Sequence, residues 1–361
     1  MSGLKGIVAD YILGLPPYPK GRDWRAEEEL VRLSANENPL GPSPKAIDAI
    51  AKSLKYLHRY PDGTGRDLKQ KLAHRLGLSS ENIILGNGSN EVIELAARTF
   101  LREAEEVLLP EPTFAFYRIV AQAQGGICIP IHLRDFKIDL MGILQRVSSR
   151  TKLIFLSNPN NPTGTIFTRL QFKDFLGRLP TGVVVLVDEA YGEYVTSTDY
   201  PFYSDYLKGE KWVIITKTFS KFYGLAGLRI GYGLAHKELI EQMEKVRQPF
   251  NVSLLALVGA QAALEDEEHI ERTSRMNKEG KRYLYTELAR LGLPFVPTEA
   301  NFILVHFGSH ATEVRHKLLQ EGIVVRSMEG YGLGEYLRVT IGLPEENKRF
   351  IQALERWQKS C

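Results

Sequence analysis

Cysteine is scarce in this sequence, and long apolar runs are missing. Only Cys128 and Cys361 occur among 361 residues, which is too few for a disulfide framework or a cysteine-ligated zinc site. No apolar run approaches the roughly 20 residues that cross a membrane. The residues after Met1 lack the apolar core of a secretory signal. We therefore expect a cytoplasmic protein that neither spans nor binds a membrane.

An excess of one charge is also missing. The 46 lysine and arginine residues nearly balance 43 acidic residues, and the net charge of +3 does not indicate nucleic-acid binding. His306, His310 and His316 lie near one another in the sequence, but no set of Cys, Asp or Glu completes a ligand shell. We predict no metal site. Hydrophobic residues at 43% and charged residues at 25% are typical of a globular enzyme.

Apolar strands alternate with helices from residue 81 onward. The expected strands are 83–85, 106–109, 127–131, 153–156, 183–187, 212–215 and 230–234. Uniformly apolar strands that alternate with helices predict a mainly parallel sheet covered on both faces. After residue 265 the order changes to helix, strands and helix. We expect an α/β fold with a three-layer large domain at 45–250. Residues 1–44 and 251–361 would form a smaller α+β domain with an N-terminal arm.

The stretch 212–229 carries the first candidate site. After the apolar strand come two lysines, two hydroxyl side chains and an arginine: Lys217, Thr218, Ser220, Lys221 and Arg229. A lysine amine can form a Schiff base, and hydroxyl and guanidinium groups can hold a phosphate. Pyridoxal phosphate has both handles. From the residues alone, either lysine can be the reactive one, and an isolated Thr-x-Ser-Lys is more often a surface junction.

Three more polar segments follow expected strands, where ligands bind in doubly wound sheets. Residues 86–90, Gly-Asn-Gly-Ser-Asn, precede a helix whose free N–H groups favour an anion, although a capped glycine turn explains them equally well. Residues 158–164 hold asparagine amides between prolines. Asp188 ends an apolar strand and needs a cationic partner, either a pyridinium nitrogen or a structural arginine.

Together these motifs resemble a known enzyme family. Asn161-Pro162-Thr163-Gly164, Asp188-Glu189-Ala190-Tyr191 and Ser220-Lys221 with Arg229 are similar in order and spacing to the fold-type I pyridoxal phosphate enzymes of the aspartate aminotransferase family. More narrowly, five stretches resemble the histidinol-phosphate aminotransferases. They are Pro17-Tyr18, Ser34-Ala35-Asn36-Glu37-Asn38-Pro39, Arg59-Tyr60-Pro61, Gln248-Pro249-Phe250-Asn251-Val252 and Glu299-Ala300-Asn301-Phe302.

The resemblance implies a role for each catalytic residue. Lys221 would bind the cofactor and shuttle a proton, and only the resemblance ranks it above Lys217. Asp188 would pair with the pyridinium nitrogen, and Asn161 and Tyr191 would bind the phenolic oxygen.

The resemblance also implies how the rest of the cofactor is held. Phe114 would stack on the ring, where the family often has tyrosine. The phosphate would be held by Ser89, Asn90, Thr218, Ser220, Arg229 and, from the second subunit of a homodimer, Tyr60.

The implied substrate contacts are Tyr18, Asn36, Arg326 and Arg338. Paired arginines suit a phosphate ester, although Arg326 can also be a surface strand end. The implied reaction exchanges an amino group between L-histidinol phosphate and 2-oxoglutarate, giving imidazole acetol phosphate and L-glutamate in histidine biosynthesis. Within the same fold, an aromatic or broad-specificity aminotransferase and a threonine-phosphate decarboxylase remain alternatives. A non-catalytic regulator is less favoured, because such proteins carry an added DNA-binding domain.

Overall fold

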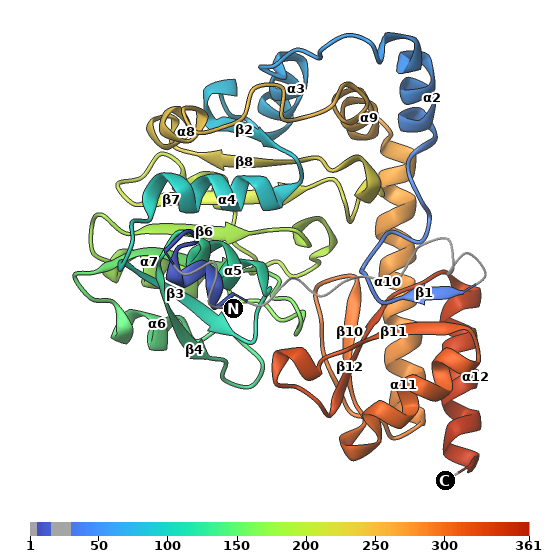
Figure 1. Cartoon of the computed structure of the whole chain (residues 1–361). Helices are drawn as coiled ribbons and strands as arrows, with labels where there is room; N and C mark the ends of the chain where they lie inside the picture. The colour runs from blue at the N-terminus through green and yellow to red at the C-terminus, as the bar shows by residue number, and fades with distance from the viewer. Residues whose placement is uncertain (1–5, 16–29, 361) are drawn as a thin grey trace.

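The computed structural model describes residues 6–15 and 30–360, and two sheets organise the chain (Figure 1). The larger sheet has the strand order β2-β8-β7-β6-β5-β3-β4. Its strands are β2 (Ile83–Gly86), β3 (Glu106–Glu111), β4 (Ile127–His132), β5 (Thr151–Ser157), β6 (Val184–Asp188), β7 (Trp212–Thr218) and β8 (Gly231–Ala235). Strands β3 to β7 pair in parallel, and β8 is antiparallel to both neighbours. The predicted α/β fold with a mainly parallel sheet is confirmed.

Helices cover both faces of this sheet because its strands are apolar on both sides. Leu153 and Phe155 of β5 belong to one core, whereas Ile154 and Leu156 between and after them belong to the other. The first core is covered by α4 (Ser89–Phe100), α5 (Phe116–Ala123) and α8 (Lys237–Glu244). The second is covered by α2 (Pro44–Ser53), α3 (Arg66–Leu76), α6 (Leu140–Arg146), α7 (Arg169–Arg178) and α9 (Leu254–Leu264).

The smaller sheet has the order β1-β11-β12-β10-β9. Its strands are β1 (Val31–Leu33), β9 (Phe295–Val296), β10 (Phe302–His306), β11 (Ile323–Ser327) and β12 (Tyr336–Thr340). Strand β1 pairs in parallel with β11, so an N-terminal strand completes a C-terminal sheet. The accompanying helices are α10 (Glu267–Arg290), α11 (Ala311–Gln320) and α12 (Pro344–Ser360), while the short α1 (Asp10–Leu13) lies against α5.

Helix α10 joins the two hydrophobic cores. Its Ile270 packs against the core of the larger sheet, and its Leu284 and Leu288 belong to the core of the smaller one. The helix extends from the level of the larger sheet down to the smaller sheet (Figure 1). Residues 252–264, including α9, pack with the larger sheet. We therefore propose that the boundary between the two domains lies in α10 rather than at residue 250.

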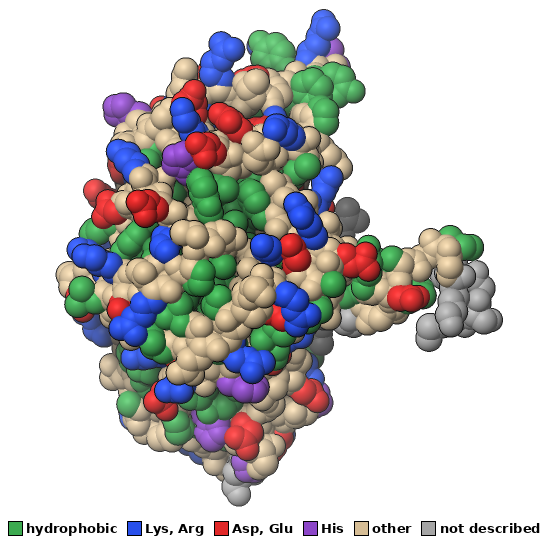
Figure 2. Space-filling view, turned by 90° about the vertical axis from the view of Figure 1, so that its left-hand side faces the viewer, with side chains coloured by type: hydrophobic (Ala, Val, Ile, Leu, Met, Phe, Trp, Pro, Cys, Tyr) green, Lys and Arg blue, Asp and Glu red, His purple; other side chains and the backbone are tan. Residues whose placement is uncertain are grey.

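The surface carries charges of both signs. Figure 2 shows a face on which lysine and arginine side chains are interspersed with aspartate and glutamate. Within residues 6–15 and 30–360, no helix combines the length and apolar composition that crossing a membrane requires.

Candidate active site

The carboxyl ends of three neighbouring parallel strands bring the predicted residues together. Asp188 is the last residue of β6, and Thr218 is the last residue of β7. The loop 158–164 follows β5, whose final residue, Ser157, lies directly opposite Asp188. Because parallel strands end at the same edge of a sheet, three motifs far apart in the sequence share one site.

Asp188 is a buried carboxylate held by three donors. The Tyr117 hydroxyl donates to Oδ2 at 2.8 Å, and the Thr216 hydroxyl and the Ala190 N–H each donate to Oδ1 at 3.1 Å. Burial raises the pKa of Asp188, although these hydrogen bonds oppose the rise. Within the part of the chain that the structure describes, no lysine or arginine forms an ion pair with Asp188. The carboxylate is therefore placed to accept a cationic group from a ligand.

Lys221 lies beyond the end of β7 and is half-buried. Its Nζ donates to the carbonyl oxygen of Ala35 at 2.8 Å. Burial lowers the pKa of Lys221 to about 8, and the positive charges of Arg338 and Arg229 contribute, while nearby carboxylates oppose them. An amine with this pKa is partly uncharged near neutral pH, as Schiff-base formation requires.

Lys217 has the opposite environment. Successive side chains of a strand point to opposite faces, so Lys217 lies on the face away from Asp188 and Thr216. Its Nζ forms ion pairs with Glu189 at 3.4 Å and Glu193 at 3.1 Å. Burial alone would lower its pKa, but the two carboxylates raise that pKa well above the ordinary value. Lys217 stays charged, which favours Lys221 as the reactive lysine.

Hydroxyl groups and a guanidinium gather near the N-terminus of α4. The Thr218 hydroxyl donates to Ser220 Oγ at 3.0 Å, and Arg229 Nη1 donates to the same oxygen at 3.2 Å. Gly88 precedes α4 with a φ of +79°, and a Cβ there would collide with the Arg229 guanidinium. The first two residues of α4 are Ser89 and Asn90. A helix N-terminus with these donors is a site for an anion such as phosphate.

Arg338 reaches this edge from β12 of the smaller sheet. Its side chain is buried, with Nη1 donating to Asn161 Oδ1 at 2.5 Å and Nη2 to the carbonyl oxygen of Ser34 at 2.9 Å. The guanidinium carbon lies 5.2 Å from the ring centre of Phe302. The Arg338 side chain therefore links the smaller sheet to the loop after β5 of the larger sheet.

Tyr191 and Asn36 form a second link between the sheets. Asn36 Nδ2 donates to the Tyr191 hydroxyl at 2.9 Å, and burial raises the pKa of Tyr191 to about 12. Asn36 has a φ of +56° and is itself held by Thr340, whose Oγ1 accepts from its backbone N–H at 3.0 Å. Asn301 Nδ2 donates to the carbonyl oxygen of Asn36 at 3.0 Å.

Three predicted residues lie outside this hydrogen-bonded cluster, and Tyr18 lies outside the described residues. Tyr60 is 83% exposed, and its ring stacks on Phe250 with 4.7 Å between centroids. Phe114 is half-buried and packs edge-on against Tyr117. Arg326 is exposed on β11, directly opposite Arg338 of β12. Because opposite residues of antiparallel strands face the same side, the two guanidiniums share one face.

Comparison with known proteins identifies the family. A family model described as aminotransferase class I and II matches residues 28–354. The chain belongs to this aminotransferase family. It is 44% identical over 350 residues to the histidinol-phosphate aminotransferase of Moorella thermoacetica, covering 95% of this chain and 91% of that protein. It is 43% identical over 355 residues to histidinol-phosphate aminotransferase 1 of Nitrosococcus oceani, covering 97% and 96%.

A solved structure agrees with these relatives. The crystal structure of the histidinol-phosphate aminotransferase from Sinorhizobium meliloti in complex with pyridoxal-5'-phosphate superposes with a TM-score of 0.91, at 27% identity and over 98% of each chain. The predicted membership of the fold-type I aminotransferases is confirmed.

Sequence reasoning missed three residues of this aminotransferase site. Tyr117 and Thr216 donate to Asp188, and Thr340 fixes Asn36. For Thr216 a signal was available, because it lies two residues before Thr218 and therefore on the same face of β7. Tyr117 and Thr340 depend on which segments pack together, and neither has a local signal.

Proposed function

We propose that this aminotransferase exchanges an amino group between L-histidinol phosphate and 2-oxoglutarate, producing imidazole acetol phosphate and L-glutamate in histidine biosynthesis. The relatives named above are histidinol-phosphate aminotransferases, and this chain aligns with nearly their whole length. The observation that supports this substrate is the pair of guanidiniums at Arg326 and Arg338 on one face of the smaller sheet. Histidinol phosphate has no carboxylate, and its phosphate accepts paired arginine contacts.

The residues of the site fit pyridoxal phosphate. Asp188 is a buried carboxylate without an ion pair among the described residues, which suits a pyridinium nitrogen. Thr218, Ser220 and Arg229 form one hydrogen-bonded group beside the start of α4, which suits a phosphate. When bound, this cofactor supplies a ring that withdraws electrons from the carbon bearing the amino group.

The chain's own groups then have distinct tasks. Lys221, with a pKa of about 8, provides an amine that can bind a carbonyl group and afterwards move the proton at the substrate carbon. Asn161 Oδ1 accepts from Arg338, so the amide that faces the cofactor and the cation that faces the substrate hold each other in place. The Tyr191 hydroxyl accepts from Asn36 and can donate its own proton to an oxygen of the cofactor.

We also propose that the enzyme is a cytoplasmic homodimer. Large apolar side chains between 50% and 83% exposed gather in one stretch of the chain: Ile47, Leu54, Tyr56, Leu57 and Tyr60. Exposed apolar patches of this kind mark protein interfaces. In the dimer, Tyr60 of one subunit would contact the phosphate site of its partner.

A half-reaction screen tests the substrate. Purified enzyme loaded with pyridoxal phosphate is mixed, without any oxo acid, with L-histidinol phosphate, phenylalanine, tyrosine, aspartate or threonine phosphate, and the absorbance of the bound cofactor is followed. We expect fast conversion with histidinol phosphate. Conversion with aromatic amino acids alone would keep the family but overturn the substrate. Release of carbon dioxide from threonine phosphate would indicate a decarboxylase.

A further inference from the structure

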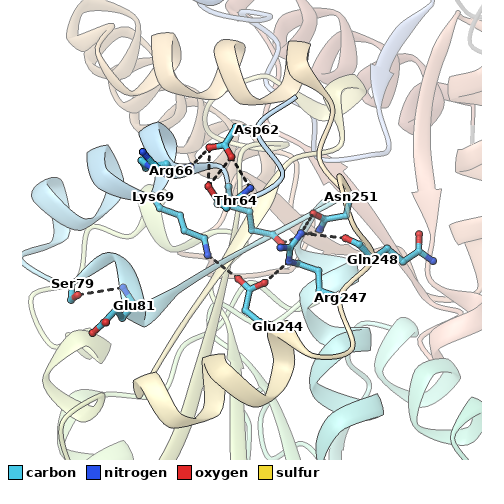
Figure 3. Close-up of polar contacts among 11 residues, drawn as sticks. Asp62, Thr64, Arg66, Lys69, Ser79, Glu81, Glu244, Arg247, Gln248 and Asn251 are labelled. Carbon is cyan, nitrogen blue, oxygen red and sulfur yellow. Dashed lines mark hydrogen bonds and ion pairs between the residues drawn. The ribbon is translucent and has the colours of Figure 1, made fainter. Parts of the chain in front are cut away.

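The segment that follows α8 is tied to the anion-binding loop at residues 86–90. Figure 3 shows Arg247 of this segment between Glu244 and Asn251, with Lys69 reaching the Glu244 carboxylate from α3. None of these residues belongs to the cluster around Asp188. Through Asn251, this set of contacts reaches the loop that carries Ser89 and Asn90.

Asn251 uses both ends of its amide in this arrangement. Its Nδ2 donates to the carbonyl oxygen of Leu85 at 3.1 Å and to Glu91 Oε2 at 2.6 Å. Its Oδ1 accepts from Arg247 Nη1 at 2.9 Å, and its backbone oxygen accepts from Asn87 Nδ2 at 3.2 Å. One side chain therefore connects the end of β2, the first turn of α4 and the segment after α8.

Glu91 is the second centre of these contacts. Besides Asn251, its Oε2 accepts the backbone N–H of Asn87 at 2.5 Å. Glu91 thereby holds the loop one residue before Gly88, where the chain turns into α4. Its negative charge stabilises the helix start. The same charge repels a nearby phosphate, unless donors such as the Asn251 amide compensate it.

The segment that carries Asn251 is braced from α3. Glu244 accepts from Lys69 Nζ at 2.8 Å and from Arg247 Nε at 2.5 Å. Burial acts to raise the pKa of Glu244, but the hydrogen bonds and charges of Lys69 and Arg247 outweigh it and lower that pKa. Glu244 therefore stays ionised and holds Arg247 against Asn251. Phe250, with a φ of +54°, presents its ring to Tyr60.

We propose that Asn251 is a positioning residue for the anion-binding loop, and that it sets the affinity of the enzyme for the phosphate group of its cofactor. It acts through Glu91 and Asn87, which fix the backbone before Ser89. The proposal rests on the proposed function, because it takes pyridoxal phosphate as the anion. It also connects the exposed Tyr60–Phe250 pair to the phosphate site by a continuous set of contacts.

The variant Asn251→Asp tests this proposal. It keeps the side-chain size but places a carboxylate oxygen against Glu91 and the Leu85 carbonyl. We expect the Kd for pyridoxal phosphate to rise at least about tenfold, as for a lost hydrogen bond to a charged group. The Kd for pyridoxal, which has no phosphate, should stay within about twofold. The ratio of the two affinities thus separates loop positioning from general damage. Fluorescence titration of the cofactor-free protein measures both.

Further variants complete the test. Asn82→Asp is a matched control, since Asn82 Nδ2 donates to the Ala235 carbonyl at 2.9 Å at the opposite end of β2; its affinity ratio should equal the parent's. In Glu91→Gln with Asn251→Asp, the glutamine amide can donate to the new carboxylate, but the Leu85 carbonyl still lacks its donor, so only part of the affinity ratio should return. Glu91→Gln alone keeps an amide oxygen that can accept from both Asn87 and Asn251, so its ratio should stay near the parent's. Asn251→Ala, which removes the amide altogether, should also reduce the ratio and serves if Asn251→Asp does not fold.

The outcomes are distinct. An unchanged ratio in Asn251→Asp, an equal loss for pyridoxal, or an equal loss in Asn82→Asp would overturn the role of Asn251. A loss accompanied by a changed sedimentation mass would also overturn it, because the effect would then come from assembly. Whether the parent converts histidinol phosphate is a separate readout. A parent that binds pyridoxal phosphate but fails that screen would refute the substrate and leave the test of Asn251 intact.

Discussion

Lys217 and Lys221 lie four residues apart, yet the fold gives them opposite surroundings. Lys217 points to the face of the larger sheet where Glu189 and Glu193 pair with it, and its pKa is raised. Lys221 lies past the strand end, where burial and the charge of Arg338 lower its pKa to about 8. The residue type is identical, so the neighbouring charges decide which amine is reactive.

Alternation of side chains along β6 and β7 places the reactive groups and the structural ion pairs on opposite faces of the sheet. Asp188 faces the site, while the next residue, Glu189, faces the other side and pairs with Lys217. Thr216 and Lys217 divide in the same way one strand over. Each side collects its own set of charges, and only one side keeps an amine that can lose its proton at moderate pH.

Lys221→Ala should have the largest effect. Without the amine, nothing in this account moves the proton at the substrate carbon, so kcat should fall more than about a thousandfold. The cofactor should still bind without a covalent link. Steady-state rates with L-histidinol phosphate and 2-oxoglutarate measure this, and appreciable turnover by the variant would refute the assignment.

Lys217→Met should damage stability instead. It leaves the buried Glu189 and the half-buried Glu193 without their cation, which costs about 3–5 kcal/mol of unfolding free energy. Urea unfolding of the cofactor-free protein measures the loss, with Lys217→Arg as the variant that keeps the charge. The two lysines would prove equivalent, against this account, if Lys217→Met kept full stability and lost turnover.

The difference in stability between cofactor-free Lys221→Met and the cofactor-free parent should depend on pH with a definite sign. The folded pKa of about 8 lies below the ordinary value of 10.5, so burying the charged amine destabilises the parent below pH 8. That penalty is lost as the pH rises from 8 to 10.5. The variant should therefore melt higher than the parent at pH 7 and equally at pH 10.5. A gap that widened toward pH 10.5 would contradict the lowered pKa.

Tyr117→Phe should have the smallest effect. It removes one of three donors to Asp188, and a loss of about 1 kcal/mol corresponds to about a fivefold fall in kcat. Tyr203→Phe is a matched control, because the buried Tyr203 hydroxyl accepts from Asn158 and does not contact Asp188. Equal falls in both variants would show that the loss reflects packing alone.

Much of the site follows from local sequence, because ligands bind at the carboxyl ends of parallel strands. Asp188, Thr218 and the loop 158–164 were predicted together for that reason. The choice between Lys217 and Lys221 was not settled by the residues, since it depends on Glu193 and Arg338, which other segments bring near. Helix α9 shows the same limit in the fold. Its sequence is apolar on all sides and does not indicate which core it joins.

The most direct test of the account is to locate the cofactor on the chain. Enzyme loaded with pyridoxal phosphate is reduced with borohydride, digested, and mapped by mass spectrometry for the lysine that carries the pyridoxyl group. We expect the label on Lys221 and an unmodified Lys217. A label on Lys217, or on no lysine, would contradict the reading of both environments.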